Sequence, residues 1–400
     1  MKPFSKRLSH LGTENAFSVI TKAKKFEREE LIPKGKKLVC LQIGEPAFDT
    51  PENVKQAAIK AIQANQTHYT PSPGIYEFRQ AIADHTSKVS CEKYVAEDVI
   101  VTPGGKPVMF YMINALIDPG DEVIIPTPGY PIYESLTNYL GGKVVALPLL
   151  EERDFNFSVA DLEKLITPRT KLIVINTPQN PTGGVLTRET LKGLAELANK
   201  YDLWVLSDEI YDRIVYEGEH VSITNFPGMP ARTVILNGCS KAYAMTGWRL
   251  GWGVTKSKEM VEYLEQLLIN DVSCTATMVQ LGGMEALKGP QEAVDMMKEE
   301  YRKRRDLLVK LVNEVPGMTC RTPKGAFYLF VNVKPILAKL GLTSAQFADK
   351  VMREANVLIL PGTAFGANGE GYIRFSYVSS EADIQEGLKR LKEYITKIYK

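Results

Sequence analysis

Short, largely apolar runs that alternate with helical patterns constrain the fold of this chain more than any other feature. The runs cover residues 99–101, 122–125, 172–175, 204–206 and 233–236, and helical patterns such as that of residues 188–200 separate them. Strands that are apolar along their whole length are typical of parallel sheets covered by helices on both faces. We therefore predict an α/β fold with a mostly parallel central sheet.

The ends of these runs carry the polar residues that are candidates for a site. Gly104, Asn180, Asp208 and Lys241 each lie within a few residues of the end of a predicted strand. Ligands of such sheets bind outside the carboxyl ends of the strands. No Gly-x-Gly-x-x-Gly sequence stands at a strand end, which disfavours a dinucleotide-binding fold.

The charge and the cysteine content argue against several other classes of protein. The 400 residues include 49 basic and 47 acidic side chains, and a net charge of +2 predicts no binding to nucleic acid or to an anionic membrane. The five cysteines are scattered and lack metal-ligand spacing, so we expect free thiols in a reducing, cytoplasmic compartment and no metal site. No apolar run approaches the roughly eighteen residues of a membrane span, and residues 1–10 contain no apolar signal segment.

Lys241 and Arg249 share a loop of small residues that follows the last predicted strand. A lysine amine can condense with an aldehyde, and a guanidinium can hold a phosphate in two parallel hydrogen bonds. These groups match the two ends of pyridoxal 5'-phosphate, whose ring serves as an electron sink. Most lysines are solvated surface charges, so this pair alone is weak evidence.

Three upstream residues supply what the pyridine ring of that cofactor requires. Asp208 ends an apolar run, and its carboxylate would keep the pyridine nitrogen protonated. Tyr211 and the amide of Asn180 could each donate a hydrogen bond to the ring phenolate oxygen. Taken singly, Asp208 could cap a helix, Tyr211 could be a core residue and Asn180 could belong to a turn. Their combination with Lys241 favours the cofactor.

A second candidate phosphate contact precedes an apolar helical run over residues 108–117. Gly104, Gly105 and Lys106 lie between a predicted strand and that run, so backbone N–H groups at the helix start can face an anion. Arg249 would add a forked charge suited to phosphate.

Taken together, these motifs resemble the class I/II aminotransferases, which are fold-type I pyridoxal-phosphate enzymes, and are nearest to prokaryotic aspartate aminotransferase-like proteins. The resemblance extends from about residue 14 to the C-terminus and includes the segments 43–46, 67–71, 103–106, 180–183, 207–211 and 373–377. It implies a large pyridoxal-phosphate-binding domain over residues 46–290. We expect residues 1–45 and 291–400 to form a small α+β domain, with a long charged linking helix over about 289–315.

The resemblance also implies roles that the spacing alone does not. Tyr130 occupies the position of an aromatic ring that stacks on the cofactor, although a core tyrosine in a turn is the alternative. Tyr69 would reach the site of a partner subunit, which implies a homodimer with shared active sites. Relatives often carry a serine three residues before the lysine, but this chain has Gly238 there, and Ser240 could take over the phosphate contact.

The substrate residues follow from the same resemblance. Arg374, expected at the end of a strand, matches the family arginine that binds the α-carboxylate, with Asn180 and the N–H of Gly44 sharing that group. A structural ion pair is the alternative for Arg374. In relatives a lysine at the position of Lys106 reaches the side-chain carboxylate of acidic substrates, and a buried ammonium would discriminate by a few kcal/mol. Lys106 could instead bind phosphate or point to solvent.

The sequence thus predicts an aminotransferase that uses an amino acid, aspartate or a related one, and a 2-oxo acid such as 2-oxoglutarate. Lys241 would act as general base on the α-proton, and the kinetics would be ping-pong. A β-lyase is the alternative with the same cofactor. A cofactor-binding sensor domain is less favoured, because we expect no DNA-binding module before residue 14.

Overall fold

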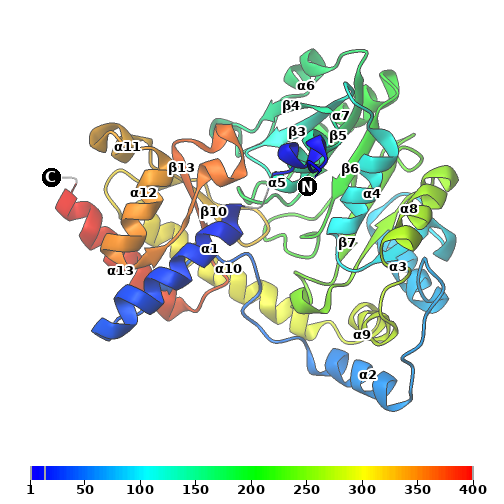
Figure 1. Ribbon diagram of the computed structural model, residues 1–400, viewed down its shortest axis with the longest axis horizontal. Coiled ribbons are helices and arrows are strands. Elements are labelled where there is room, and N and C mark those ends of the chain that lie inside the picture. Colours follow the sequence, from blue (N-terminus) through cyan, green and yellow to red (C-terminus); the bar gives the residue numbers. More distant parts are fainter. Residues whose placement is uncertain (1, 13–14, 399–400) are drawn as a thin grey trace.

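The computed structural model describes residues 2–12 and 15–398. A seven-stranded sheet forms the larger part of the molecule, and a four-stranded antiparallel sheet belongs to the smaller part (Figure 1). A two-stranded parallel pairing joins the N-terminal and C-terminal regions.

The large sheet has the strand order β2-β8-β7-β6-β5-β3-β4. The five strands β4, β3, β5, β6 and β7 run parallel to one another, whereas β8 runs antiparallel to both β2 and β7. All five predicted runs are strands, and the mostly parallel sheet is confirmed. The strands are β2 (Val99–Thr102), β3 (Glu122–Thr127), β4 (Lys143–Pro148), β5 (Thr170–Asn176), β6 (Trp204–Asp208), β7 (Thr233–Gly238) and β8 (Gly251–Val254).

Alternate residues of the central strands pack into two different apolar clusters. Leu172 and Val174 of β5 join the cluster that contains α4 (Lys106–Leu116), α5 (Pro131–Tyr139) and α8 (Lys258–Asp271). Ile173 and Ile175 join the cluster that contains α6 (Val159–Leu165) and α7 (Arg188–Lys200). Because successive strand residues face opposite sides, this division shows that helices cover both faces of the sheet.

The helix α7 illustrates how the sequence sets these elements. Its apolar residues recur at helical spacing and are buried, and the side chain of Thr187 caps the helix by accepting a hydrogen bond from the N–H of Thr190. The remaining helices of the larger part are α2 (Glu52–Gln63), α3 (Tyr76–Val89) and α9 (Thr277–Lys288).

The smaller part is built around the sheet β12-β13-β10-β9. Its strands are β9 (Thr319–Cys320), β10 (Tyr328–Asn332), β12 (Leu360–Pro361) and β13 (Tyr372–Ser376), and β1 (Val39–Cys40) pairs with β11 (Val357–Leu358). Its helices are α1 (Asn15–Phe26), α11 (Lys334–Leu340), α12 (Ser344–Lys350) and α13 (Glu381–Ile398). The helix α10 (Glu292–Asn313) runs between the two parts (Figure 1), where a long linking helix was expected.

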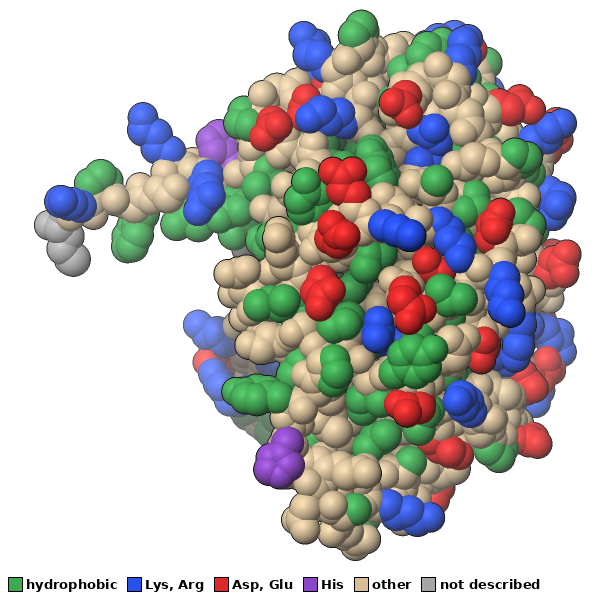
Figure 2. All heavy atoms as spheres, turned by 90° about the vertical axis from the view of Figure 1, so that its right-hand side faces the viewer, with side chains coloured by type: hydrophobic (Ala, Val, Ile, Leu, Met, Phe, Trp, Pro, Cys, Tyr) green, Lys and Arg blue, Asp and Glu red, His purple; other side chains and the backbone are tan. Residues whose placement is uncertain are grey.

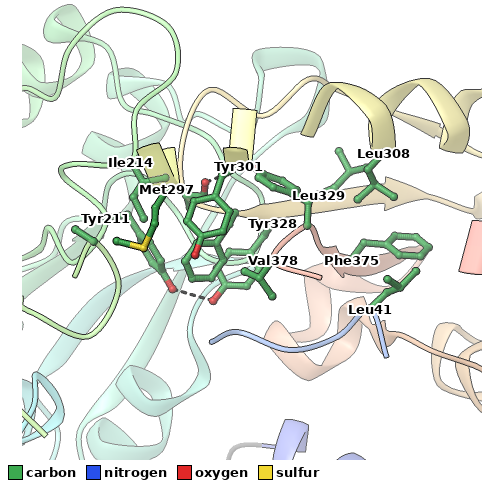
Figure 3. Packing of buried hydrophobic residues seen from close by; sticks show 14 of the residues in the cluster. Leu41, Tyr211, Ile214, Met297, Tyr301, Leu308, Tyr328, Leu329, Phe375 and Val378 are labelled. Carbon is green, nitrogen blue, oxygen red and sulfur yellow. Dashed lines mark hydrogen bonds between the residues drawn. The ribbon is translucent and has the colours of Figure 1, made fainter. Parts of the chain in front are cut away.

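One apolar cluster extends from the larger part into the smaller one. Figure 3 shows Tyr211 of the larger part against Tyr328 of β10, and Leu41 near Phe375 of β13. This packing brings residues 39–41 beside the C-terminal strands. The expected domain boundaries at residues 46 and 290 stay a prediction.

Figure 2 shows both acidic and basic side chains scattered over one face of the molecule. Residues 2–12, which include the short helix η1 (Lys6–His10), are exposed and extend from the body as a thin arm in that view. Within the described residues, no helix has both the length and the apolar character needed to cross a membrane.

Candidate active site

A cavity of about 590 Å³ lies at the carboxyl ends of β5, β6 and β7 and reaches β10 and β13 of the smaller part. This is the edge of the sheet at which the sequence predicted a site. The cavity brings together eleven of the predicted residues: Gly44, Gly105, Lys106, Tyr130, Asn180, Asp208, Tyr211, Ser240, Lys241, Arg249 and Arg374. Gly104 and Tyr69 do not line it.

Asp208, the last residue of β6, lines this cavity and is only 5% exposed. Its Oδ1 accepts a hydrogen bond from the N–H of Ile210 at 3.2 Å, and its Oδ2 accepts one from the hydroxyl of Tyr133. Burial raises the pKa of Asp208 to about 6, and the bond from Tyr133 opposes that rise. A carboxylate in this setting favours a cationic group beside it.

Lys241 follows β7, and its ammonium lies between the two parts of the molecule. Its Nζ donates a hydrogen bond to the carbonyl oxygen of Gly44 at 2.6 Å and lies 5.8 Å from the ring centroid of Phe327. Gly44 has no room for a side chain, because a Cβ there would come within 2.8 Å of the hydroxyl of Tyr328. The amine therefore lies where the main chain of the smaller part meets the loop after β7.

Arg249 adds a positive charge to the lining of the cavity. Arg249 adopts the left-handed conformation, and its Nη1 donates to the carbonyl of Thr246 at 2.7 Å. The guanidinium lies against Gly104, whose φ of +91° and lack of a side chain permit this approach. Gly105 precedes Lys106, the first residue of α4, and both line the cavity, so the start of that helix lies at the cavity wall. Gly104 does not line the cavity, but it leaves room for the Arg249 guanidinium that does.

Tyr130 and Lys106 flank one wall of the cavity. The Nζ of Lys106 lies 5.8 Å from the ring centroid of Tyr130. Tyr130 directly precedes α5, and its ring makes an edge-on contact with Tyr133 at 5.7 Å between centroids. Lys106 is exposed in the single chain, and its role towards acidic substrates stays a prediction. The first residue of α4 stands at the open side of the cavity, and water can reach its side chain.

Arg374 occupies the middle of β13, not the end that the sequence suggested, and is 4% exposed. Its Nη1 donates to Oδ1 of Asn180 at 2.8 Å, and its Nη2 donates to the carbonyl of Gln42 at 2.7 Å. The guanidinium carbon lies 4.3 Å from the ring centroid of Tyr328 and 4.6 Å from that of Phe365. Two aromatic rings and two neutral acceptors therefore hold the guanidinium in place.

Several residues of the site were not predicted. The hydroxyls of Tyr211 and Tyr328 lie 2.8 Å apart, as the dashed line in Figure 3 marks. Asn176 accepts a hydrogen bond from the N–H of Asn180 at 2.9 Å and donates one to the carbonyl of Asp208 at 3.1 Å, so it ties two loops of the site together. Tyr133 follows Tyr130 by one helical turn, and that spacing could have revealed it. No local signal pointed to Tyr328, which the pairing of β10 with β13 brings in.

The five cysteines are free thiols, and no group of His, Cys, Asp or Glu in residues 2–12 and 15–398 could hold a metal ion. Tyr69 is 90% exposed. A residue that reaches a partner subunit would need such exposure in a single chain, and its role stays a prediction.

The arrangement fits pyridoxal phosphate. The lining of the cavity combines a buried carboxylate at the end of β6 with a guanidinium that precedes β8, the start of α4 and an amine. The buried Ser240 lines the wall next to that amine, where a replacement phosphate ligand was expected. The donor set therefore matches a molecule that is anionic at one end and cationic at its ring nitrogen.

Comparison with known proteins gives the same result. The family of class I and II aminotransferases matches residues 36–391. An aspartate aminotransferase of Pyrococcus horikoshii is 38% identical over 378 residues, which cover 94% of this chain and 95% of that protein. An aromatic-amino-acid aminotransferase of Thermococcus litoralis is 38% identical over 362 residues, 90% of this chain and 92% of that protein.

A solved structure extends the comparison to the whole fold. The aspartate aminotransferase from Thermus thermophilus with maleate has a TM-score of 0.91 at 37% identity and covers 98% of this chain and 100% of that chain. The resemblance and the fold class drawn from the motifs are confirmed. The chain belongs to the class I and II aminotransferases and is a pyridoxal-phosphate-dependent enzyme that transfers amino groups.

Proposed function

We propose that this enzyme moves the α-amino group between aspartate, or a related amino acid, and a 2-oxo acid such as 2-oxoglutarate. The observation that carries the proposal is the placement of Lys241, Asp208 and Arg374 around one cavity. An amino acid needs a cation for its α-carboxylate and a base for its α-proton. The cavity offers both.

The cofactor would be held by residues that line the cavity. Arg249, Ser240 and the N–H groups at the start of α4 would bind its phosphate, and Asp208 would face its ring nitrogen. Tyr211 would lie beside the ring oxygen, and Tyr130 would cover one face of the ring. When bound, pyridoxal phosphate supplies an electron sink for the bonds of the substrate α-carbon.

The residues of this chain would position the substrate and move its proton. Arg374 would bind the α-carboxylate in two parallel hydrogen bonds, in place of one of its present acceptors. Asn180 and the N–H of Gly44 would share that group. The Nζ of Lys241 would remove the proton from the substrate α-carbon, hold it and then give it up again. This requires the amine to leave the carbonyl of Gly44, to which it now donates a hydrogen bond.

Lys106 is our candidate for recognition of the substrate side chain. Its ammonium stands on the cavity wall beside Tyr130. The Thermus thermophilus enzyme similar to this chain was solved with maleate, which is a dicarboxylate with as many carbon atoms as aspartate. A lysine at this wall suits the second carboxylate of such a molecule.

Aromatic amino acids are a second candidate for the donor. Ile20, Ile43 and Met109 also line the cavity, and these apolar side chains suit a ring better than a carboxylate. A relative 38% identical to this chain is named for aromatic amino acids.

We further propose a homodimer in the cytoplasm. Tyr69 and Phe4 are each 90% exposed in the single chain, and a large apolar side chain with such exposure suits an interface. Tyr69 would contribute to the phosphate end of the partner's cavity. The free thiols suit a reducing compartment.

A panel of amino donors against 2-oxoglutarate, pyruvate and oxaloacetate tests the substrate proposal. We expect the highest kcat/KM for aspartate with 2-oxoglutarate, and ping-pong kinetics. A preference for phenylalanine or tyrosine over aspartate would favour the second candidate. Release of ammonia and pyruvate without an amino acceptor would instead establish the β-lyase reaction.

A further inference from the structure

Tyr133 is completely buried behind Asp208 and does not line the cavity. It belongs to the first turn of α5, and its hydroxyl donates a hydrogen bond to Oδ2 of Asp208. We propose that Tyr133 is a positioning residue that keeps the Asp208 carboxylate ionised and fixed in orientation. The inference rests on the proposed function, in which Asp208 faces the ring nitrogen of the cofactor.

The geometry fixes the carboxylate through both of its oxygens. The N–H of Ile210 binds Oδ1 at 3.2 Å, and the hydroxyl of Tyr133 binds Oδ2. A carboxylate has about four acceptor sites, so both oxygens can accept a further donor from the cavity. The two bonds come from different elements, a loop and a helix, and together they set the plane of the carboxylate.

The electrostatic surroundings of the Tyr133 hydroxyl make it a hydrogen-bond donor to Asp208. Burial raises the pKa of Tyr133 well above its usual value, and the charge of Asp208 raises it further. The phenol therefore keeps its proton and acts as a hydrogen-bond donor. Burial raises the pKa of Asp208 to about 6, and the bond from Tyr133 is the largest influence in the opposite direction. The charge of Glu209 also raises the pKa of Asp208, and that of Lys241 lowers it, while Tyr211 is a neutral neighbour whose own pKa is raised by burial. Without Tyr133, Asp208 would take up a proton at a pH closer to neutrality.

The position of Tyr133 links two parts of the proposed cofactor site. Tyr130 and Tyr133 stand one helical turn apart, and their rings meet edge-on at 5.7 Å. The start of α5 thus positions both the Tyr130 ring on the cavity wall and the Tyr133 hydroxyl that donates to Asp208.

Tyr133→Phe tests this inference, and Tyr111→Phe is its matched control. Tyr111 is also buried in the same apolar cluster, and its hydroxyl donates to a carboxylate, that of Asp271 at 2.7 Å, away from the cavity. For each protein we would measure the dissociation constant of pyridoxal phosphate over a range of pH. In Tyr133→Phe, the fall in affinity on acidification should begin about one pH unit higher than in the wild type, whereas Tyr111→Phe should leave it in place.

Turnover gives the second measurement. Tyr133→Phe should lower kcat about tenfold and change KM for the amino acid much less, because the hydroxyl acts through a group that faces the cofactor. In an Asp208→Ala background, the same substitution should have no further effect on kcat. A tenfold loss that persists there, or an unchanged pH profile in Tyr133→Phe, would overturn the inference.

Two outcomes distinguish a failure of this inference from a failure of the proposed function on which it rests. If Asp208→Ala itself leaves cofactor affinity and kcat unchanged, the proposed role of Asp208 fails. If only Tyr133→Phe has no effect, the role of Tyr133 fails alone. If Tyr133→Phe does not fold, 3-fluorotyrosine at position 133 provides a stronger donor of nearly the same shape. It should move the fall in affinity to lower pH, and no movement would contradict the inference.

Discussion

Replacement of Lys106 by methionine would separate substrate recognition from cofactor binding. Lys106 is the first residue of α4 and lines the cavity, with its Nζ 5.8 Å from the ring centroid of Tyr130. Methionine keeps the length and much of the apolar stem while it removes the charge. The substitution should therefore weaken the binding of acidic side chains and leave the wall of the cavity largely intact.

The exposure of Lys106 determines the size of the effect. A fully buried ion pair that loses one partner costs about 3 to 5 kcal/mol, whereas an exposed pair contributes about 1 kcal/mol or less. Lys106 is exposed in the single chain but stands at the wall of a concave site. We therefore expect an intermediate loss of about 1 to 2 kcal/mol for aspartate and glutamate, which is roughly a 5- to 30-fold decrease in kcat/KM.

The assay compares kcat/KM for aspartate, glutamate, alanine and phenylalanine in the wild type and in Lys106→Met. Alanine and phenylalanine carry no second carboxylate, so their values should change less than about threefold. Lys106→Arg is the matched control, because it keeps the positive charge and should retain most of the acidic preference. An equal loss for all four donors, together with weaker cofactor binding, would refute the reasoning and identify Lys106 as a phosphate ligand.

Three further predictions address the catalytic groups. Lys241→Ala should still bind the cofactor but lose transamination by orders of magnitude, and near-normal turnover in a steady-state assay would rule out its role as base. Asp208→Ala should slow removal of the α-proton, measured with α-deuterated substrate, whereas Arg374→Ala should weaken the binding of every α-amino acid by about 2 to 3 kcal/mol. Identical kinetic defects in these two variants would contradict the division of roles. Finally, the cofactor-free protein should become less stable as pH rises from about 4 to about 6, because Asp208 then loses a proton that burial favours. Urea unfolding should show this loss in the wild type and a smaller one in Asp208→Asn, and equal losses would point to other groups.

Much of the large sheet could be predicted because its strands are marked by local composition. The runs at 172–175 and 204–206 lie within β5 and β6, and the helical pattern over 188–200 matches α7. A strand that is buried on both faces carries few polar residues, so a continuous apolar run in the sequence indicates such a strand directly. The loops after such strands could then be assigned to one edge by topology alone.

Contacts that depend on distant pairing left no local signal. Tyr328 meets Tyr211 across 117 residues of sequence, and only the pairing of β10 with β13 brings it beside Arg374. The sequence likewise left open whether Lys106 faces solvent, because the exposure of the first residue of a helix depends on what packs around it. Residue type and spacing predicted which groups gather, but not how deeply each is buried.

The burial of Asp208 shows how this site trades stability for function. A rise in pKa from 3.8 to about 6 means that the ionised carboxylate costs the cofactor-free protein roughly 3 kcal/mol at neutral pH. The folded state binds the proton of Asp208 more tightly than the unfolded state does, so the contribution of this group to stability is greatest at low pH and is lost as pH rises through 6. This cost is what remains after the hydrogen bonds from Tyr133 and from the N–H of Ile210, and without those bonds it would be larger. A cation that contacts Asp208 would remove most of the remainder, so the same burial that destabilises the empty cavity favours a protonated ring nitrogen in it.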